Sequence, residues 1–319
     1  MTVTAPSPIT PREQLSLPYR FEFAADEHGA ILDCFREHGF ALIRQMAPPE
    51  VVADLRDAVW EVLGADDPPA HGHNRTSPEF VEHSPKAIRL LDASAYVELN
   101  RTLFGTDALT IHRSFAVLKN AGSPPVGWHR DYHHTVYDAP SEPDEFLDAG
   151  DHGFRALWYL DGSYPDNGGL WLIPDSHRDD WAGLEGFVFT EGRKSFHRVG
   201  EPVGDYEGFD DPQMLPLYVD PGDLVLYDLK TYHAAAAQTH SLRRACALIL
   251  RPSEPAIAVP WAQTETTRRF LERTPERFAS FLRNYVGIDY GWEIDAAGER
   301  IAPGPGPAGG QRGTPLRGS

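Results

Sequence analysis

The segment 127–134 holds the residues best suited to bind a metal ion. Its sequence, GWHRDYHH, places His129 and Asp131 two positions apart. On an extended strand, residues i and i+2 project to the same face about 7 Å apart, so an imidazole and a carboxylate can converge on one ion. The third ligand is expected at His233, which follows the β-like run GDLVLYDL. Two histidines and one aspartate that leave further positions open are typical of non-haem Fe(II) sites that react with O2.

These ligands fall in a region whose pattern is typical of an antiparallel β protein. From about 110 to 252, short apolar runs such as SFAVLKN, FRALWYL and GLWLIP are separated by clusters of Gly, Pro, Asp and Asn, which predicts a sandwich or barrel. Helical spacing of apolar residues predicts flanking helices over 27–39 and 48–64, with a strand over 40–46 between them. A polar, Pro-rich loop is expected over 65–85, and one or two amphipathic helices over 264–286. The predicted fold class is therefore mainly β with flanking α-helices.

The sequence predicts one catalytic domain between an N-terminal arm and a C-terminal tail. Residues 1–20 hold four prolines and little apolar periodicity, so they are expected to form a flexible arm. The tail 301–319 is rich in Gly and Pro and is expected to be disordered. Between them, 21–300 is predicted to be a single domain with its core at about 110–252, because neither an internal repeat nor a second core is apparent.

The amino-acid composition limits the kinds of molecule that the chain is expected to bind. The chain has 319 residues, with 29 Lys and Arg against 47 Asp and Glu, for a net charge of -18. This balance argues against nucleic acid and against anionic membranes as partners. No apolar run approaches the roughly 20 residues of a membrane span, and Cys34 and Cys246 form no CxxC motif. We expect a cytoplasmic monomer or homodimer that acts on a small molecule.

Two further blocks accompany the HxD pair. They are DNGGLWLIPDSHR at 166–178 and PGDLVLYDLKTYH at 221–233. Together with GWHRDYHH they resemble the phytanoyl-CoA dioxygenase (PhyH) family of Fe(II)- and 2-oxoglutarate-dependent dioxygenases, over roughly 27–252. That family has an HxD, a hairpin close to NGxLxxxPGSH, a GDxxxF/Y strand before the distal His, and an Arg about 11 positions later. Asp175 stands where the family usually has Gly, and Ala235 where it often has a small hydroxyl residue.

The resemblance implies a double-stranded β-helix core, of the jelly-roll or cupin-like kind, that uses Fe(II), 2-oxoglutarate and O2. His129, Asp131 and His233 would be the metal ligands and catalytic centre. Arg244, 11 positions after His233, would grip the distal carboxylate of 2-oxoglutarate, since a guanidinium offers a bidentate fork. Its neighbour Arg243 would face the other way on a strand. Lys119 is the second expected co-substrate residue.

The substrate is less clearly indicated. Trp128, Tyr132, His133 and Tyr159 are expected to line the substrate cavity, although aromatic residues of this kind also form cores. The run 138–151 contains six acidic residues and no Lys or Arg. It predicts either a loop that orients a cationic or polyhydroxylated substrate or an ordinary solvated loop, and both interpretations stay open.

The reaction implied by the resemblance is oxidative decarboxylation of 2-oxoglutarate to succinate and CO2, coupled to hydroxylation of an unactivated C–H bond. The small-molecule substrate would be a secondary metabolite, as in antibiotic biosynthesis. The presence of Asp131 argues against halogenation, while desaturation, ring closure, epoxidation and acetal formation stay open. Two other classes are a cupin-like isomerase or hydrolase without oxygen chemistry, which would not need Arg244, and a non-catalytic relative that binds a small molecule.

Overall fold

A computed structural model describes residues 17–131, 147, 153–289, 293–294 and 300–301. The predicted arm over 1–20 and the tail over 301–319 lie almost entirely outside these residues, so both stay predictions. The acidic run 138–151 also lies outside them, apart from Leu147.

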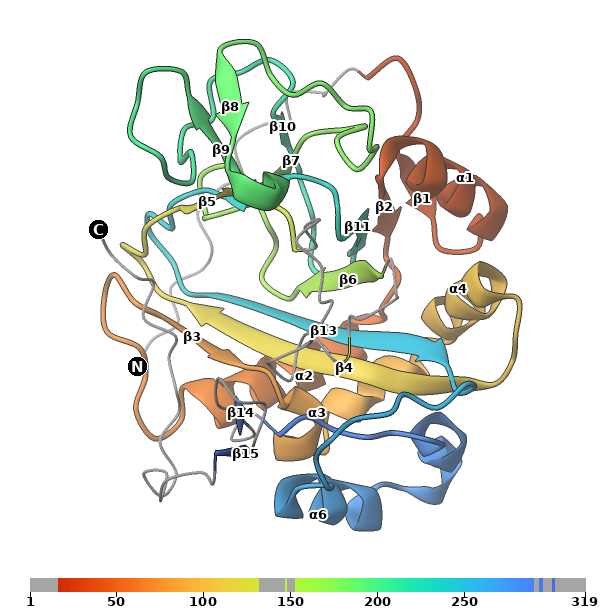
Figure 1. Ribbon diagram of the computed structural model, residues 1–319. Helices are drawn as coiled ribbons and strands as arrows, with labels where there is room; N and C mark the ends of the chain where they lie inside the picture. Colours follow the sequence, from red (N-terminus) through yellow and green to blue (C-terminus); the bar gives the residue numbers. More distant parts are fainter. Residues whose placement is uncertain (1–16, 132–146, 148–152, 290–292, 295–299, 302–319) are drawn as a thin grey trace.

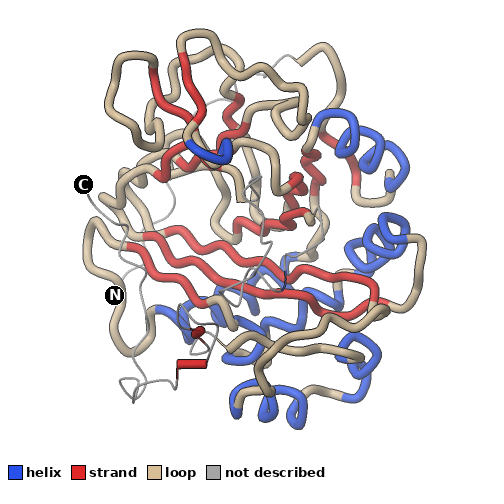
Figure 2. Tube along the Cα trace, in the orientation of Figure 1, coloured by secondary structure: helices blue, strands red, loops and turns tan. Residues whose placement is uncertain are grey.

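Two β-sheets carry the centre of the molecule (Figure 1 and Figure 2). The larger has the strand order β1-β2-β11-β6-β13-β4-β3, and the smaller has the order β10-β7-β12-β5. Neighbouring strands are antiparallel except for β1 and β2. The strands of the larger sheet are β1 (Glu22–Ala24), β2 (Phe40–Arg44), β3 (Asn74–Ser77), β4 (Leu109–Lys119), β6 (Phe154–Tyr159), β11 (Leu224–Asp228) and β13 (Arg243–Pro252). Those of the smaller sheet are β5 (Val126–His129), β7 (Leu170–Leu172), β10 (Leu215–Pro216) and β12 (His233–Ala235).

Helices flank these sheets, largely as predicted. The helices α1 (His28–His38) and α2 (Pro49–Leu63) confirm the two N-terminal predictions, and β2 confirms the strand between them. The C-terminal prediction is met by α6 (Glu265–Arg273) and a 3-10 helix (Glu276–Leu282). The remaining described elements are α3 (Phe80–His83), α4 (Ser94–Phe104), β8 (Phe187–Phe189), β9 (Phe196–Arg198), β14 (Glu293–Ile294), β15 (Arg300–Ile301) and two 3-10 helices (Ala87–Asp92 and Glu191–Arg193). None of the helices in the described ranges is both long and apolar enough to cross a membrane.

The prediction of one long loop over 65–85 was partly wrong. The segment contains β3, which pairs with β4 at the edge of the larger sheet, and the short helix α3. The sequence of β3 is NRTS, and only its last residue is buried. An edge strand with so little apolar burial has no period-2 pattern for a sequence analysis to recognise.

Local sequence explains how the N-terminal elements begin and end. Helix α2 begins at Pro49, whose ring favours the first helical position. Helix α1 ends at Gly39, which has φ of +78° and whose N–H donates to the carbonyl of Phe35. A Cβ at Gly39 would lie 2.5 Å from His177 Nδ1 and 2.6 Å from Thr231 Oγ1. Glycine is therefore required at Gly39 on steric grounds as well as for its φ.

Two of the three hydrophobic clusters among the described residues pack against the sheets. The principal cluster includes the apolar face of α2 and side chains from both sheets, such as Leu55, Leu157, Leu172 and Leu248. A separate, mainly aromatic cluster lies against the smaller sheet and includes Trp128, Phe196 and Tyr232. Figure 1 places α2, α3 and α6 on one side of the long β4–β13 pair and the β8–β9 hairpin on the opposite side of the molecule. The expected class, mainly β with flanking helices, is confirmed.

Candidate metal and co-substrate site

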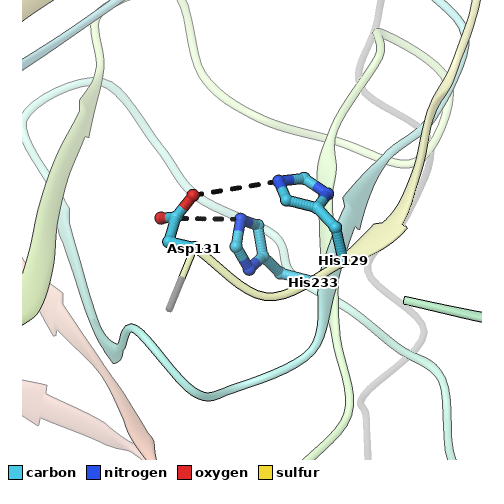
Figure 3. A group of neighbouring side chains, drawn as sticks. All are labelled: His129, Asp131 and His233. Carbon is cyan, nitrogen blue, oxygen red and sulfur yellow. Dashed lines mark ion pairs between the residues drawn. The ribbon is translucent and has the colours of Figure 1, made fainter. Parts of the chain in front are cut away.

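His129, Asp131 and His233 converge on one point. One potential ligand atom from each residue lies within 4.8 Å of those from the other two. His129 Nε2 is 3.9 Å from Asp131 Oδ1, and His233 Nε2 is 3.9 Å from Asp131 Oδ2 (Figure 3). The two imidazoles come together because His129 on β5 pairs directly with His233 on β12. These separations suit three ligands arranged around one side of a single ion.

The backbone fixes the tautomers of the two histidines. Nδ1 of His129 lies 2.8 Å from the carbonyl of Gly127, and Nδ1 of His233 lies 3.0 Å from the carbonyl of Thr231. A carbonyl only accepts, so each Nδ1 carries the proton and each Nε2 keeps its lone pair toward Asp131. Burial, and then the charge of His129, lowers the pKa of His233 to about 4, which leaves that imidazole neutral at physiological pH.

Asp131 is held by an arginine from the larger sheet. Arg155 on β6 donates from Nε to Asp131 Oδ2 over 2.8 Å. Burial alone would raise the pKa of Asp131, but the charge of Arg155, followed by those of His233 and His129, lowers it well below its ordinary value. Tyr227, which pairs with Arg155 across β11 and β6, has its hydroxyl 3.5 Å from His233 Nε2. Arg155 thus keeps the carboxylate of Asp131 ionised and oriented.

Two buried cations lie further along the same face of the larger sheet. Lys119 ends β4 and pairs with Arg243 at the start of β13, and their exposed fractions are 2% and 5%. Arg243 lies 5.1 Å from the ring centroid of Tyr159, which shares the strand β6 and its inner face with Arg155. Lys119 Nζ donates to the carbonyl of Ala236, and Arg243 donates to that of Gly168. Burial, and then the charge of Arg243, lowers the pKa of Lys119 to about 7.

Neither cation forms an ion pair within the described ranges of the chain. Burial also lowers the pKa of Arg243, although the nearby Tyr159 and Asp161 partly oppose this. Two adjacent buried charges of the same sign are costly unless an anion joins them. The pair of Lys119 and Arg243 therefore has the chemistry of a binding site for a carboxylate.

The expectation that Arg244 faces the site, with Arg243 turned away, was wrong. Arg244 lies on the other face of β13, where Nε and Nη2 donate to the two oxygens of Asp161 over 2.8 and 2.7 Å. Arg56 on α2 also approaches Asp161, at 3.2 Å. The expected alternation along a strand was correct, but its phase was reversed. Arg244 links β13 to α2 through Asp161.

The predicted substrate residues have different environments. Tyr159 lies on the inner face beside Arg243, as above. Trp128 does not face the triad: it is fully buried in the aromatic cluster, and its Nε1 donates to the carbonyl of Gly208. Tyr132 and His133 lie outside the described residues. Asp175, the departure from the family turn, has φ of +63° and pairs with His38 over 2.9 Å, so this aspartate tolerates the conformation usually left to glycine.

Sequence reasoning missed three residues around the triad. Tyr227 occupies the F/Y position of the GDxxxF/Y run, so its motif could have identified it. Arg155 belongs to no recognisable motif, and its contact with Asp131 has no signal in the neighbouring sequence. Arg243 is adjacent in sequence to Arg244, and only the register of β13 with β4 distinguishes the two.

Comparisons with known proteins agree with this geometry. The phytanoyl-CoA dioxygenase (PhyH) family matches residues 35–245, about two thirds of the chain. HygX from Streptomyces hygroscopicus, solved with nickel and 2-oxoglutarate bound, superposes with a TM-score of 0.52 at 18% identity, covering 75% of this chain and 93% of HygX. A second HygX structure that also contains hygromycin B gives 0.52 at 16% identity, with the same coverage of both chains.

SnoN, a non-haem α-ketoglutarate-dependent epimerase from nogalamycin biosynthesis, gives a TM-score of 0.50 at 16% identity, covering 71% of this chain and 83% of SnoN. The search of curated proteins found no match. At these identities the structural likeness establishes the fold. Together with the family match, it confirms the double-stranded β-helix core expected from the sequence.

Proposed function

Since the chain belongs to the phytanoyl-CoA dioxygenase (PhyH) family of Fe(II)- and 2-oxoglutarate-dependent oxygenases, we propose that it hydroxylates an unactivated C–H bond of a small-molecule natural product. The reaction consumes O2 and 2-oxoglutarate and releases succinate and CO2. Catalysis takes place within one domain over residues 21–300.

The metal ligands in this proposal are His129 and His233, through Nε2, and Asp131, through its carboxylate. The donor set fits iron: potential ligand atoms of two imidazoles and one carboxylate all lie within 4.8 Å of one another. Each imidazole is already oriented by a backbone carbonyl, and Asp131 by Arg155. Such supporting contacts keep ligands in position and set their tautomers.

The observation that carries the proposal is the buried pair of Lys119 and Arg243. In this proposal Arg243, in place of Arg244, grips the distal carboxylate of 2-oxoglutarate with its guanidinium, and Lys119 adds a second positive charge. A metal enzyme without oxygen chemistry, or a non-catalytic relative, would have no use for two buried cations beside the triad. The pair therefore favours the oxygenase over both alternatives.

Iron with 2-oxoglutarate and O2 supplies the oxidising power for the C–H bond. The chain's own residues bind and orient the reactants. Arg243 and Lys119 anchor one end of 2-oxoglutarate and so direct its other end toward the triad. Arg155 keeps one oxygen of Asp131 occupied, which favours ligation through the other.

The substrate in this proposal is polyhydroxylated. One fold relative, HygX, has been solved with hygromycin B bound, and another, SnoN, is an epimerase of nogalamycin biosynthesis. These two relatives support a role in tailoring a natural product, as the sequence suggested. The alternative of a cationic substrate depends on Glu142, Asp144, Glu145 and Asp148, which lie outside the described residues.

The test is succinate formation from 2-oxoglutarate with Fe(II) and O2, measured against a panel of polyhydroxylated natural products. We expect one succinate for each product molecule that gains one oxygen atom. The variant His129→Ala should form none, while His240→Ala, at an exposed histidine away from the triad, should match the wild type. Persistent turnover in His129→Ala, or no turnover in the wild type, would refute the proposal. Product masses also separate hydroxylation from desaturation and ring closure.

A further inference from the structure

A cavity of about 120 Å³ lies between the helices α1 and α4 and the ends of β4, β6 and β13. Figure 1 shows α1 and α4 on the same side of the molecule, with α4 next to the C-terminal end of β13. Its walls are mainly apolar and include Phe35, Phe104 and Phe154, and the rings of Phe35 and Phe104 both contact that of Phe154. The polar side chains that line it are His112, Arg155 and Arg251.

Arg155 joins this cavity to the triad. Its side chain lines the cavity, and its Nε donates to Asp131. Lys119 and Arg243 lie toward the other end of the same sheet face, because Tyr159 beside Arg243 is four positions, or about 13 Å, from Arg155 along β6. The proposed co-substrate site and the cavity thus lie toward opposite ends of β6, and Arg155 connects the cavity to Asp131.

The cavity offers a ligand one unsatisfied polar atom. Nδ1 of His112 is buried and has no hydrogen-bond partner within the described part of the chain. Arg251 is engaged by the carbonyls of Pro252 and Asn284, and Arg155 by Asp131. Burial, and then the charges of Arg113, Arg251 and Arg155, hold the pKa of His112 well below its ordinary value, so its imidazole is neutral. A cationic ligand would be repelled by the same arginines.

We infer that this cavity receives a six-membered ring of the substrate that carries one neutral hydroxyl group, with the ring against the phenylalanines and the hydroxyl hydrogen-bonded to His112. The inference rests on the proposed function and specifies its substrate. Cavities of about 150 Å³ lined by Leu, Ile and Phe bind benzene in other proteins, so a space of this size suits one ring. A carboxylate would need several donors, whereas the described residues that line the cavity offer one unsatisfied side-chain atom.

The test is isothermal titration of the full chain, loaded with Ni(II) and 2-oxoglutarate, with phenol, benzene and benzylammonium as probes. We expect phenol to bind about fivefold more tightly than benzene, which corresponds to one net hydrogen bond. His112→Leu should remove this preference and leave benzene unaffected. Leu103→Trp, which fills the cavity from α4, should abolish binding of both. Val203→Trp is the control, since Val203 is 78% exposed and does not line the cavity.

Three results would overturn the inference. They are the absence of saturable binding, a phenol preference that survives His112→Leu, and benzylammonium binding as tightly as phenol. A fourth readout separates a substrate site from an isolated void: saturation with phenol should change the visible spectrum of Ni(II) in the wild type, through Arg155 and Asp131, and an unchanged spectrum contradicts the assignment. Failure of the proposed function is distinct, because it would abolish succinate formation whether or not a ring binds.

Discussion

Exchanging one arginine at a time tests which of two neighbours binds the co-substrate. We predict that Arg243→Gln weakens 2-oxoglutarate binding and that Arg244→Gln does not. Arg243 is 5% exposed and lies beside Lys119, whereas Arg244 is paired with Asp161 on the opposite face of β13. The two substitutions are chemically identical and adjacent in sequence, so each is the matched control for the other.

The size of each effect follows from burial. Removing one partner of a buried, hydrogen-bonded charge pair costs about 2–5 kcal/mol, and a mid-range loss of about 3 kcal/mol raises Kd on the order of 100-fold. Arg243→Gln should still fold, since it removes a buried cation without an ion-pair partner among the described residues. Arg244→Gln breaks a partly exposed pair, so we expect a cost of about 1 kcal/mol and a Tm lower by a few degrees.

The assay is anaerobic titration of each variant, loaded with Co(II), with 2-oxoglutarate, together with thermal unfolding of the unliganded protein. A Kd that rises about 100-fold for Arg243→Gln and less than twofold for Arg244→Gln supports the assignment. The opposite pattern would refute the assignment of Arg243 and would show that Arg244, eleven positions after His233, binds 2-oxoglutarate.

Three further predictions concern single buried residues. Because the pKa of Lys119 is about 7 before an anion binds, 2-oxoglutarate binding at pH 7 should take up about half a proton, measured by titration calorimetry in buffers of different ionisation enthalpy, and Lys119→Met should take up none. Burial raises the pKa of Glu82 to about 7 from 4.5, so the folded state binds this proton more tightly than the unfolded state. The free energy of unfolding of the wild type therefore falls as pH rises from about 4.5 to 7. In urea unfolding, Glu82→Gln should exceed the wild type in this free energy by up to about 3 kcal/mol at pH 8 and by little at pH 4. Trp128→Phe should lower stability by about 1–3 kcal/mol through lost packing and the lost bond to Gly208, while KM for 2-oxoglutarate changes less than twofold; a large rise in KM would return Trp128 to the binding site.

The triad could be predicted from the sequence because its signal is local. His129 and Asp131 share a strand face by their spacing alone, and His233 follows a recognisable run. The choice between Arg243 and Arg244 could not be made in this way. Residues 236–242 separate β12 from β13, and a count across a loop does not determine which face a later residue occupies.

Contacts between distant strands were also beyond the sequence. Arg155 reaches Asp131 from a strand that starts 23 positions later, and nothing in FRALWYL marks one arginine as a partner of the metal site. Trp128 illustrates the same limit. It neighbours His129 in sequence, but successive strand residues point to opposite faces, and the face of Trp128 packs against Phe196. The face of the strand on which a side chain lies is therefore better evidence for a place in the site than its proximity to a metal ligand in the sequence.

The most direct test of the central claim is an anaerobic crystal structure of the protein with Fe(II) and 2-oxoglutarate. The account predicts one ion bound by His129, Asp131 and His233, with the distal carboxylate of 2-oxoglutarate between Arg243 and Lys119. An ion bound elsewhere, or a carboxylate bound at Arg244, would contradict it.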